Sequence, residues 1–168
     1  DLYTGCLERL GKNLPKQVSL KIEIDPTDLP VKADATQLEQ LLEILWENAV
    51  EAMAADETGE ISICLKNAQP SEIQGDHLFP VEFAAVDGPF ASMTISDTGS
   101  GIEENRMEFI FDPFYSEKFT GRGLGLAVAL GIIKAHSGCV ALESQVGKGS
   151  RFTVFLPLAT SREAGQDR

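Results

Sequence analysis

The last third of the chain constrains the fold most, because two strand-like segments there are separated by a short glycine turn. Residues 139–143 and 151–156 are rich in apolar side chains, and the turn between them contains Gly147-Lys148-Gly149. A connection this short joins antiparallel strands, whereas parallel neighbours need a crossover of a dozen or more residues. The sequence therefore predicts an antiparallel element and argues against a doubly wound α/β fold.

Three further segments have the two-residue period that is typical of strands. Residues 18–24 alternate strictly between apolar and polar side chains, which predicts a half-buried strand. Residues 60–65 alternate in the same way, and residues 93–97 form a strand-like segment that ends at Asp97. Because helical patterns lie between these segments without a regular β-α-β order, we expect an α+β fold with helices on one face of the sheet.

Two longer segments have the apolar spacing of amphipathic helices. Residues 34–54 follow this pattern, with Asp34 placed to cap the first turn, and residues 124–135 follow it as far as a stop at Gly138. A short helix is expected near residues 103–109. These helices would bury their apolar stripes against the sheet.

The remaining segments are less regular. Residues 1–17 are expected to be a short helix or linker, which would end a preceding helical domain, and residues 159–168 a polar, disordered tail. Residues 66–92 are punctuated by proline and glycine, and we expect one strand there, at Val81–Val86. The expected organisation is therefore one domain over residues 18–158, with no assigned role for the 66–92 insert.

Composition narrows the classes of partner. The chain has 168 residues, and 14 Lys and Arg against 26 Asp and Glu give a net charge of −12. This charge repels phosphate backbones, so nucleic acid is not an expected partner. No apolar run reaches the ~18 residues of a membrane span. We expect no direct membrane contact by this domain.

The cysteines and the N-terminus indicate the compartment. Cys6, Cys64 and Cys139 are odd in number and widely spaced, which fits neither a disulfide framework nor a zinc site. A reducing compartment, the cytoplasm, is therefore expected, although the parent protein could be anchored in a membrane. The first residues have no signal sequence and resemble the start of a fragment from a longer protein.

Two glycine clusters are the first candidates for a ligand site. Asp97-Thr98-Gly99-Ser100-Gly101-Ile102 follows a strand, and Gly121-Arg122-Gly123-Leu124-Gly125-Leu126 opens a helix. A glycine turn before a helix N-terminus presents free amides to anions. The dinucleotide fingerprint G-x-G-x-x-G fails because Leu126 replaces its third glycine. Each cluster by itself is equally consistent with a tight turn.

Asn48 is the second candidate. It lies at the edge of the apolar stripe of the helix at 34–54, where an amide can face a cleft and offer its oxygen to Mg²⁺. Considered alone, the same position also suits a solvated asparagine at a helix boundary.

Together these motifs resemble the gyrase, Hsp90, histidine kinase and MutL ATPase superfamily over residues 18–158. Asn48 lies in a segment similar to its N box, and the two glycine clusters are similar to its glycine boxes. Phe111-Asp112-Pro113-Phe114-Tyr115-Ser116-Glu117-Lys118 resembles the F box of sensor histidine kinases. The F box and the last two strands favour the histidine kinase branch. The resemblance implies a two-layer α/β sandwich with a mixed, mostly antiparallel sheet.

The resemblance also implies a site for ATP and Mg²⁺. Asn48 would coordinate the metal, Asp97 would accept a hydrogen bond from the adenine amine, and residues 103–122 would form the ATP lid. Lys118 and Arg122 are the candidate phosphate cations, and with Asn48 they form the expected catalytic set. The implied nucleotide-binding residues are Asn48, Asp97, Gly99, Gly101, Ile102, Phe114, Lys118, Gly121, Arg122, Gly123, Leu124, Gly125 and Leu126.

One position departs from the hydrolytic relatives. These place a water-activating glutamate four residues before the N-box asparagine, where this chain has Ile44. On a helical wheel, Glu43 points about 140° away from Asn48, Glu47 about 100° and Glu51 about 60°. We therefore expect slow intrinsic ATP hydrolysis.

The implied activity is transfer of the ATP γ-phosphoryl group to a histidine on a dimerisation domain outside this chain, and from there to a response regulator. Within this chain, His77 is expected in a solvated loop and His136 in a packing or capping role. The isolated chain should therefore not phosphorylate itself. Two alternatives remain: a degenerate, nucleotide-gated interaction module, which Ile44 favours, and a serine kinase of the anti-sigma-factor type, against which the F box argues.

Overall fold

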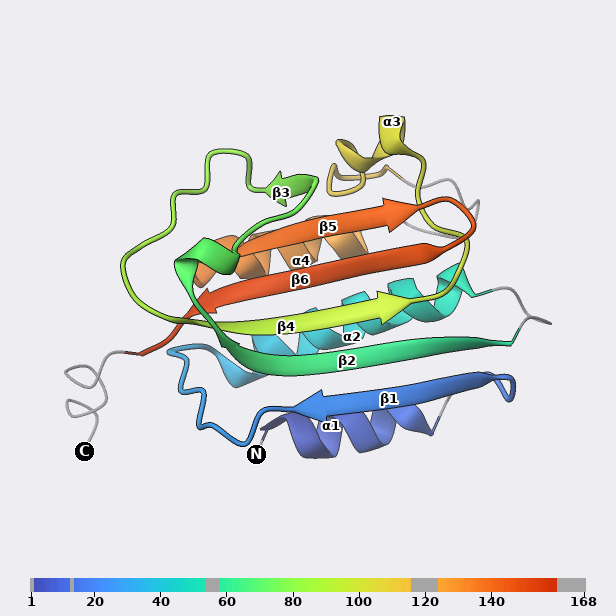
Figure 1. Cartoon of the computed structure of the whole chain (residues 1–168), viewed down its shortest axis with the longest axis horizontal. Helices are drawn as coiled ribbons and strands as arrows, with labels where there is room; N and C mark the ends of the chain where they lie inside the picture. The colour runs from blue at the N-terminus through green and yellow to red at the C-terminus, as the bar shows by residue number, and fades with distance from the viewer. Residues whose placement is uncertain (1, 13, 54–57, 116–123, 160–168) are drawn as a thin grey trace.

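A six-stranded mixed sheet runs through the molecule in the order β1-β2-β4-β6-β5-β3 (Figure 1). The computed structural model describes residues 2–12, 14–53, 58–115 and 124–159. The strands are β1 (Val18–Ile24), β2 (Gly59–Ala68), β3 (His77–Phe79), β4 (Phe90–Asp97), β5 (Cys139–Gln145) and β6 (Gly149–Pro157). β1 pairs with β2 in parallel, and the other neighbouring pairs are antiparallel. The mixed, mostly antiparallel sheet is therefore confirmed.

The longer helices cover one face of this sheet. They are α1 (Leu2–Gly11), α2 (Ala35–Ala52) and α4 (Gly125–Ala135), and all three lie behind the sheet in Figure 1. The short α3 (Glu104–Met107) lies beside the end of β5, and a 3-10 turn, η1 (Pro70–Glu72), precedes β3. This two-layer arrangement confirms the expected α+β class.

The core lies between the helices and the sheet. The buried stripe of α2 consists of Leu38, Leu41, Leu42, Leu45, Trp46 and Ala49. Opposite it, Ile61, Ile63 and Ile95 are almost fully buried. Burying each such side chain stabilises the fold by about 1.5–3 kcal/mol, so this stripe fixes which side of α2 faces the sheet.

β1 alternates as predicted, but its second half is not buried. Leu20, Ile22 and Ile24 lie opposite the buried apolar residues of β2, yet Ile22 is 41% and Ile24 51% exposed. β1 is an edge strand with a neighbour on one side only, and α1 lies behind it (Figure 1). Ile24 also lines a cavity of about 480 Å³, whose wall includes Asp25 and Leu29 of the loop that follows β1.

The 66–92 insert differs most from the sequence prediction. Val81–Val86 form no strand, and Val81 is exposed. The insert's own strand is β3, which pairs with β5 at the edge of the sheet. His77 begins this strand and is half-buried, so the expectation of a solvated loop residue was wrong.

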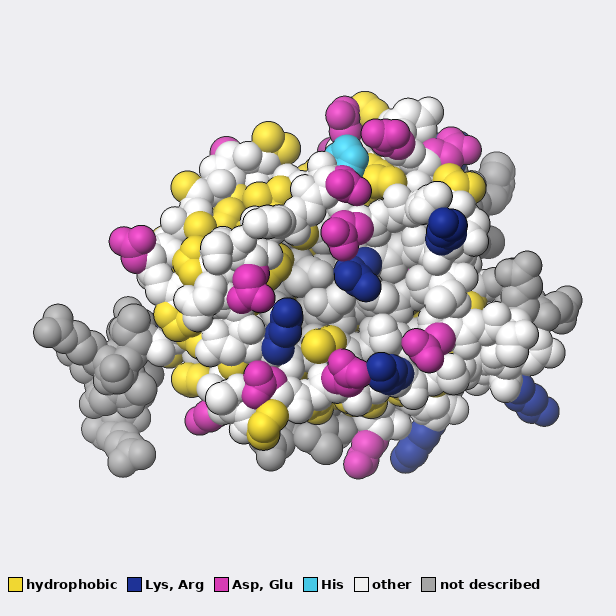
Figure 2. Space-filling view, in the orientation of Figure 1, with side chains coloured by type: hydrophobic (Ala, Val, Ile, Leu, Met, Phe, Trp, Pro, Cys, Tyr) yellow, Lys and Arg dark blue, Asp and Glu magenta, His cyan; other side chains and the backbone are white. Residues whose placement is uncertain are grey.

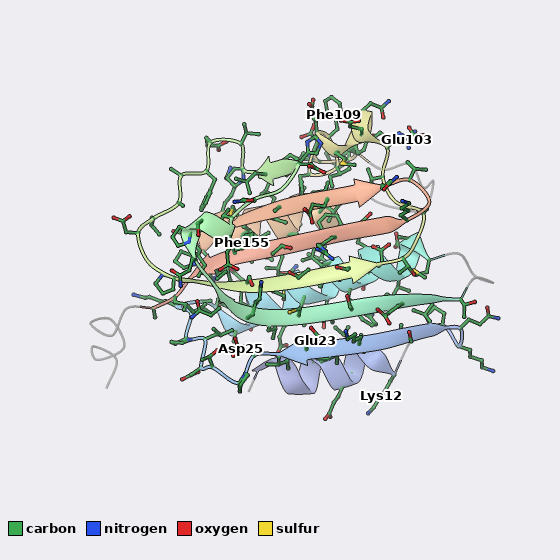
Figure 3. All side chains as sticks on the ribbon, viewed as in Figure 1. Lys12, Glu23, Asp25, Glu103, Phe109 and Phe155 are labelled. Atoms are coloured by element: carbon green, nitrogen blue, oxygen red, sulfur yellow. The ribbon has the colours of Figure 1, made fainter. Side chains whose placement is uncertain are left out.

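The insert covers part of the outer face of the sheet. Ala68, Phe90, Cys139, Ala141 and Phe155 form a second buried cluster there, and Ile73, Leu78 and Phe83 of the insert pack on it. Phe155 lies beside η1 in Figure 3. Away from the insert, the outer face carries interspersed charges (Figure 2), including the ion pairs Lys21–Glu23 and Glu143–Arg151.

No helix in the described part of the chain is both long enough and apolar enough to cross a membrane.

Candidate functional site

A cavity of about 390 Å³ opens where the C-terminal half of α2, the start of α4 and the loop after β4 meet. α3 and the segment that follows it, as far as Tyr115, close another side. The cavity is lined by Asn48, Glu51, Ala52, Ser100, Gly101, Ile102, Glu103, Arg106, Ile110, Tyr115, Leu126, Val146 and Ser150. Its wall thus joins segments that are far apart in the sequence.

Asn48 reaches this wall because of the way α2 begins and packs. The Asp34 carboxylate accepts a hydrogen bond from the Gln37 amide (3.0 Å) and caps the helix, as the sequence predicts. With Leu45 and Ala49 buried against the sheet, Asn48 is half-buried at the edge of the stripe and faces the cavity. An amide at this position offers an oxygen acceptor to a bound ligand or cation.

Asp97 ends β4 and is 6% exposed. Its Oδ1 accepts a hydrogen bond from the Gly99 amide at 2.9 Å. Burial raises the pKa of this carboxyl group above its usual value, and the backbone amides of Gly99 and Ser150 partly offset the rise. Asp97 does not itself line the cavity with Asn48; it is adjacent to that cavity through its β6 partner Ser150, which does.

The first glycine cluster holds the loop between two other elements. A Cβ at Gly99 would collide with the carbonyl oxygen of Ala52, at the end of α2. Gly101 has φ of +71°, and a Cβ there would collide with the backbone of Gln145. The Ser100 amide also donates to the Ala52 carbonyl (3.0 Å). The glycines therefore allow close packing of protein backbone, and this packing brings Gly101 and Ile102 to the cavity wall.

The second glycine cluster is described only from Leu124 onward. Gly121, Arg122 and Gly123, as well as Lys118, lie outside the described residues. Leu126 lines the cavity, whereas Leu124 is 39% exposed and starts α4 without a side-chain cap. The first amides of a helix lack intrahelical partners, so this end of α4 can bind an anion.

Gly125 lies against Ile44, the α2 residue at the position where the hydrolytic relatives have a glutamate. A Cβ built on Gly125 would lie 3.5 Å from Cγ2 of Ile44. Ile44 is partly buried and packs on the main core. The side chain that replaces the expected glutamate is therefore part of the contact between α2 and α4.

The F-box residues point in different directions. Phe111 is buried, Tyr115 lines the cavity, and Phe114 is 77% exposed with φ of +67°. Phe114, which the resemblance assigned to the nucleotide, is thus not part of the cavity wall. Tyr115 occupies the wall instead, and Ile110 joins it there.

The cavity also contains charged residues that the sequence analysis did not place there. Glu51 lies one helical turn beyond Asn48, and α3 contributes Arg106, which forms an ion pair with Glu103 (3.2 Å). The i+3 spacing from Asn48 was the signal that could have identified Glu51. Glu43, by contrast, pairs with Arg9 of α1 at 2.8 Å, away from this site.

Comparison with known proteins identifies the family of this chain. The model of the family "Histidine kinase-, DNA gyrase B-, and HSP90-like ATPase" matches residues 33–160, so the chain belongs to this family. Sensor kinase CckA of Brucella abortus is 34% identical over 169 residues, covering 99% of this chain and 17% of that protein. Sensor histidine kinase ZraS of Escherichia coli K12 is 30% identical over 151 residues, covering 90% of this chain and 28% of that protein.

Solved structures show the same fold. The catalytic domain of histidine kinase ThkA superposes with a TM-score of 0.67 at 28% identity, covering 94% of this chain and 88% of that one. The mycobacterial sensor histidine kinase MprB superposes with a TM-score of 0.71 at 19% identity, which supports the fold alone. The chain is thus an ATPase-family domain of the kind found in sensor histidine kinases, and it spans less than a third of the two sensor kinases compared here.

Proposed function

We propose that this chain binds Mg-ATP in the cavity beside α2 and donates the γ-phosphoryl group to a histidine on a dimerisation domain of the same parent protein. The observation that carries the proposal is the convergence of Asn48, Gly101, Ile102 and Leu126 on one cavity, next to the buried Asp97. The sensor kinase names of the full-length relatives support the same activity.

In this proposal, Asp97 recognises adenine. A carboxylate accepts hydrogen bonds but cannot donate them, so it pairs with the exocyclic amine of adenine and disfavours the carbonyl of guanine. The Gly99 amide orients the carboxylate through its bond to Oδ1. Ile102 and Leu126, both in the cavity wall, would pack against the base and ribose.

The residues present suit Mg²⁺ as a companion of ATP. Mg²⁺ prefers oxygen ligands and is commonly held by one or two protein groups together with substrate phosphates and water. Asn48 supplies one such oxygen in the cavity, and Glu51 lies beside it. Bound there, the metal would neutralise charge on the phosphates.

The phosphates would lie toward the N-terminus of α4. The amides of Gly123 and Gly125 and the side chain of Lys118 or Arg122 would contact them, as the family resemblance implies. Phosphoryl transfer depends mainly on positioning and on charge neutralisation. In the transfer, the bond between the γ-phosphorus and the bridging oxygen breaks, a bond to the acceptor imidazole nitrogen forms, and ADP leaves.

The phosphate acceptor would be supplied from outside the chain, as would the response regulator that receives the group next. His136 is engaged inside this fold: its Nε2 accepts a hydrogen bond from the Asp34 amide (3.1 Å), and its Nδ1 lies 2.7 Å from the Ile132 carbonyl oxygen. His77 is half-buried in β3. The isolated chain should therefore bind ATP without phosphorylating itself.

Calorimetric titration with ATP, ADP and GTP, with and without Mg²⁺, tests this proposal. Asp97→Asn should weaken ATP binding because the amide presents a donor to the adenine amine, and Asn48→Ala should reduce the dependence on Mg²⁺. Asp28→Asn and Asn67→Ala are matched controls, because neither residue lines the cavity. Unchanged Mg-ATP affinity in both site variants would contradict the assignment.

One observation favours a second function. Ile44 packs against Gly125, which leaves an apolar contact where hydrolytic relatives have their water-activating glutamate. A chain that only binds ATP, and so gates contact with a partner, needs no such group. Adding a separately produced dimerisation domain of the parent protein, with radiolabelled ATP, separates the two functions: a labelled histidine supports the kinase, and binding without label supports the interaction module.

A further inference from the structure

The edge strand of the insert contacts the segment that walls the nucleotide cavity. Phe79, the last residue of β3, is 8% exposed, and its ring centroid lies 4.7 Å from that of Phe111. Phe111 in turn meets Phe152 of β6 edge-to-face, with centroids 6.2 Å apart. Tilted and edge-to-face ring pairs at these distances are attractive beyond the area that they bury. Phe111 is thus held between the insert and the sheet.

Phe111 lies within the stretch of chain that forms one wall of the cavity. Ile110 precedes it and Tyr115 follows four residues later, and both line the cavity. Two turns shape this stretch: the Asp112 amide donates to the Phe109 carbonyl (2.9 Å), and the Tyr115 amide donates to the Asp112 carbonyl (3.2 Å). Phe111 therefore lies in the same short, hydrogen-bonded stretch of chain as the wall residues Ile110 and Tyr115.

β3 is held in place by contacts that lie outside the cavity. Phe79 pairs with Val140 and Leu78 with Ala141 of β5. Side chains of adjacent strand residues point to opposite faces, and Leu78 accordingly packs on the outer-face cluster while Phe79 reaches Phe111. β3 therefore links the cluster on the outer face of the sheet to Phe111 beside the cavity.

We propose that Phe79 is a positioning residue for nucleotide binding, acting through Phe111 on Ile110 and Tyr115. This proposal rests on the function proposed above, since it takes the cavity to be the ATP site. Removing the Phe79 ring leaves a void beside Phe111, and that ring can then relax away from its present position. The wall must then be ordered when ATP binds, which weakens affinity.

The test compares three variants of the full chain by calorimetric titration with Mg-ATP, at a temperature at which circular dichroism shows each to be folded. Phe79→Ala removes the ring, Phe79→Leu keeps most of the apolar volume, and Leu78→Ala is the control in the same strand on the opposite face. Remote substitutions that alter coupling change affinity by roughly two- to thirtyfold. We expect a loss of about tenfold for Phe79→Ala, a smaller loss for Phe79→Leu, and wild-type affinity for Leu78→Ala.

Denaturant unfolding of the same variants separates positioning from stability. Phe79→Ala and Leu78→Ala should both lower the unfolding midpoint, because each truncates an apolar side chain that packs against a buried cluster. If Phe79→Ala binds Mg-ATP as the wild type does, or if Leu78→Ala loses as much affinity, the positioning role is wrong. If Phe79→Ala does not fold, Phe79→Leu is used in its place. A weaker affinity of Phe79→Leu for Mg-ATP then supports the positioning role, and wild-type affinity contradicts it. Failure of the wild-type chain to bind ATP would instead refute the function proposed for the cavity.

Discussion

At the scale of single residues, Asp97 combines a proposed role in adenine recognition with a cost in stability. Its carboxylate is buried at the end of β4, and burial raises its pKa. A carboxyl group whose folded pKa exceeds its unfolded pKa makes its full contribution to stability at pH values below the unfolded pKa. That contribution is lost as the pH rises through the folded pKa. The ionised Asp97 therefore opposes folding at neutral pH.

This predicts that Asp97→Asn stabilises the chain at neutral pH while it weakens adenine recognition. The amide oxygen can still accept from the Gly99 amide, and the side chain has no charge to desolvate. The gain over wild type, measured by urea unfolding, should be smallest at pH values below ~4, the usual aspartate pKa, and should increase as the pH rises above it. A gain that is independent of pH would contradict the attribution to ionisation of Asp97.

The three cysteines should differ sharply in reactivity. Burial raises the pKa of Cys139 to about 12 and raises that of Cys6, whereas Cys64 is half-buried on β2. Because the thiolate is the nucleophile, a maleimide or disulfide reagent should label Cys64 in the native chain and Cys139 only after unfolding. Mass spectrometry of digested, labelled protein identifies the sites. Rapid native labelling of Cys139 would show that β5 is not buried as described.

At the scale of elements, the start of α2 bears on both stability and the site. The Asp34 side chain caps the helix through the Gln37 amide, and the Asp34 backbone amide donates to His136 at the end of α4. Asp34→Ala should therefore cost about 1 kcal/mol of stability, while Asp34→Asn, which preserves a capping oxygen, should cost less. Urea denaturation measures both. Equal costs for the two variants would argue against the cap.

Elements with a long, regular pattern were predictable from the sequence. The helix expected at 34–54 is α2, and the helix expected at 124–135 is α4, because each carries enough apolar residues at helical spacing to fix its own type. β3 was missed because three residues carry no measurable period. Its strand conformation depends on pairing with β5, about sixty residues later in the chain.

The candidate site was predictable to the extent that it depends on motifs. Asn48, Gly101, Ile102 and Leu126 lie around one cavity, as the order of the motifs implied. The sequence could not predict that Tyr115, rather than Phe114, lines the cavity. The positive φ of Phe114 turns the chain at that point, and no residue period applies within a loop. The contribution of α3 to the wall depends likewise on tertiary packing.

At the scale of the whole molecule, the net charge of −12 opposes the approach of an anionic nucleotide. The ligand is proposed to bind through short-range contacts: the amides at the start of α4 and a magnesium ion at Asn48. Charges farther apart than the Debye length, about 10 Å at 0.1 M salt, are largely screened, whereas contacts at a few ångströms are screened much less. Salt should therefore weaken the overall repulsion more than it weakens the local attraction.

This predicts that the association rate of Mg-ATP increases with ionic strength between about 0.01 M and 0.1 M, the range over which the Debye length falls from about 30 to 10 Å. Stopped-flow measurements with a fluorescent ATP analogue, at constant free Mg²⁺, give this rate. A variant in which two carboxylates outside the cavity wall are neutralised, Glu23→Gln with Asp25→Asn, should start from a faster rate at low salt and respond less to added salt (Figure 3). An association rate that falls with salt in both proteins would mean that positive charge at the site, rather than the net charge of the chain, governs the encounter with ATP.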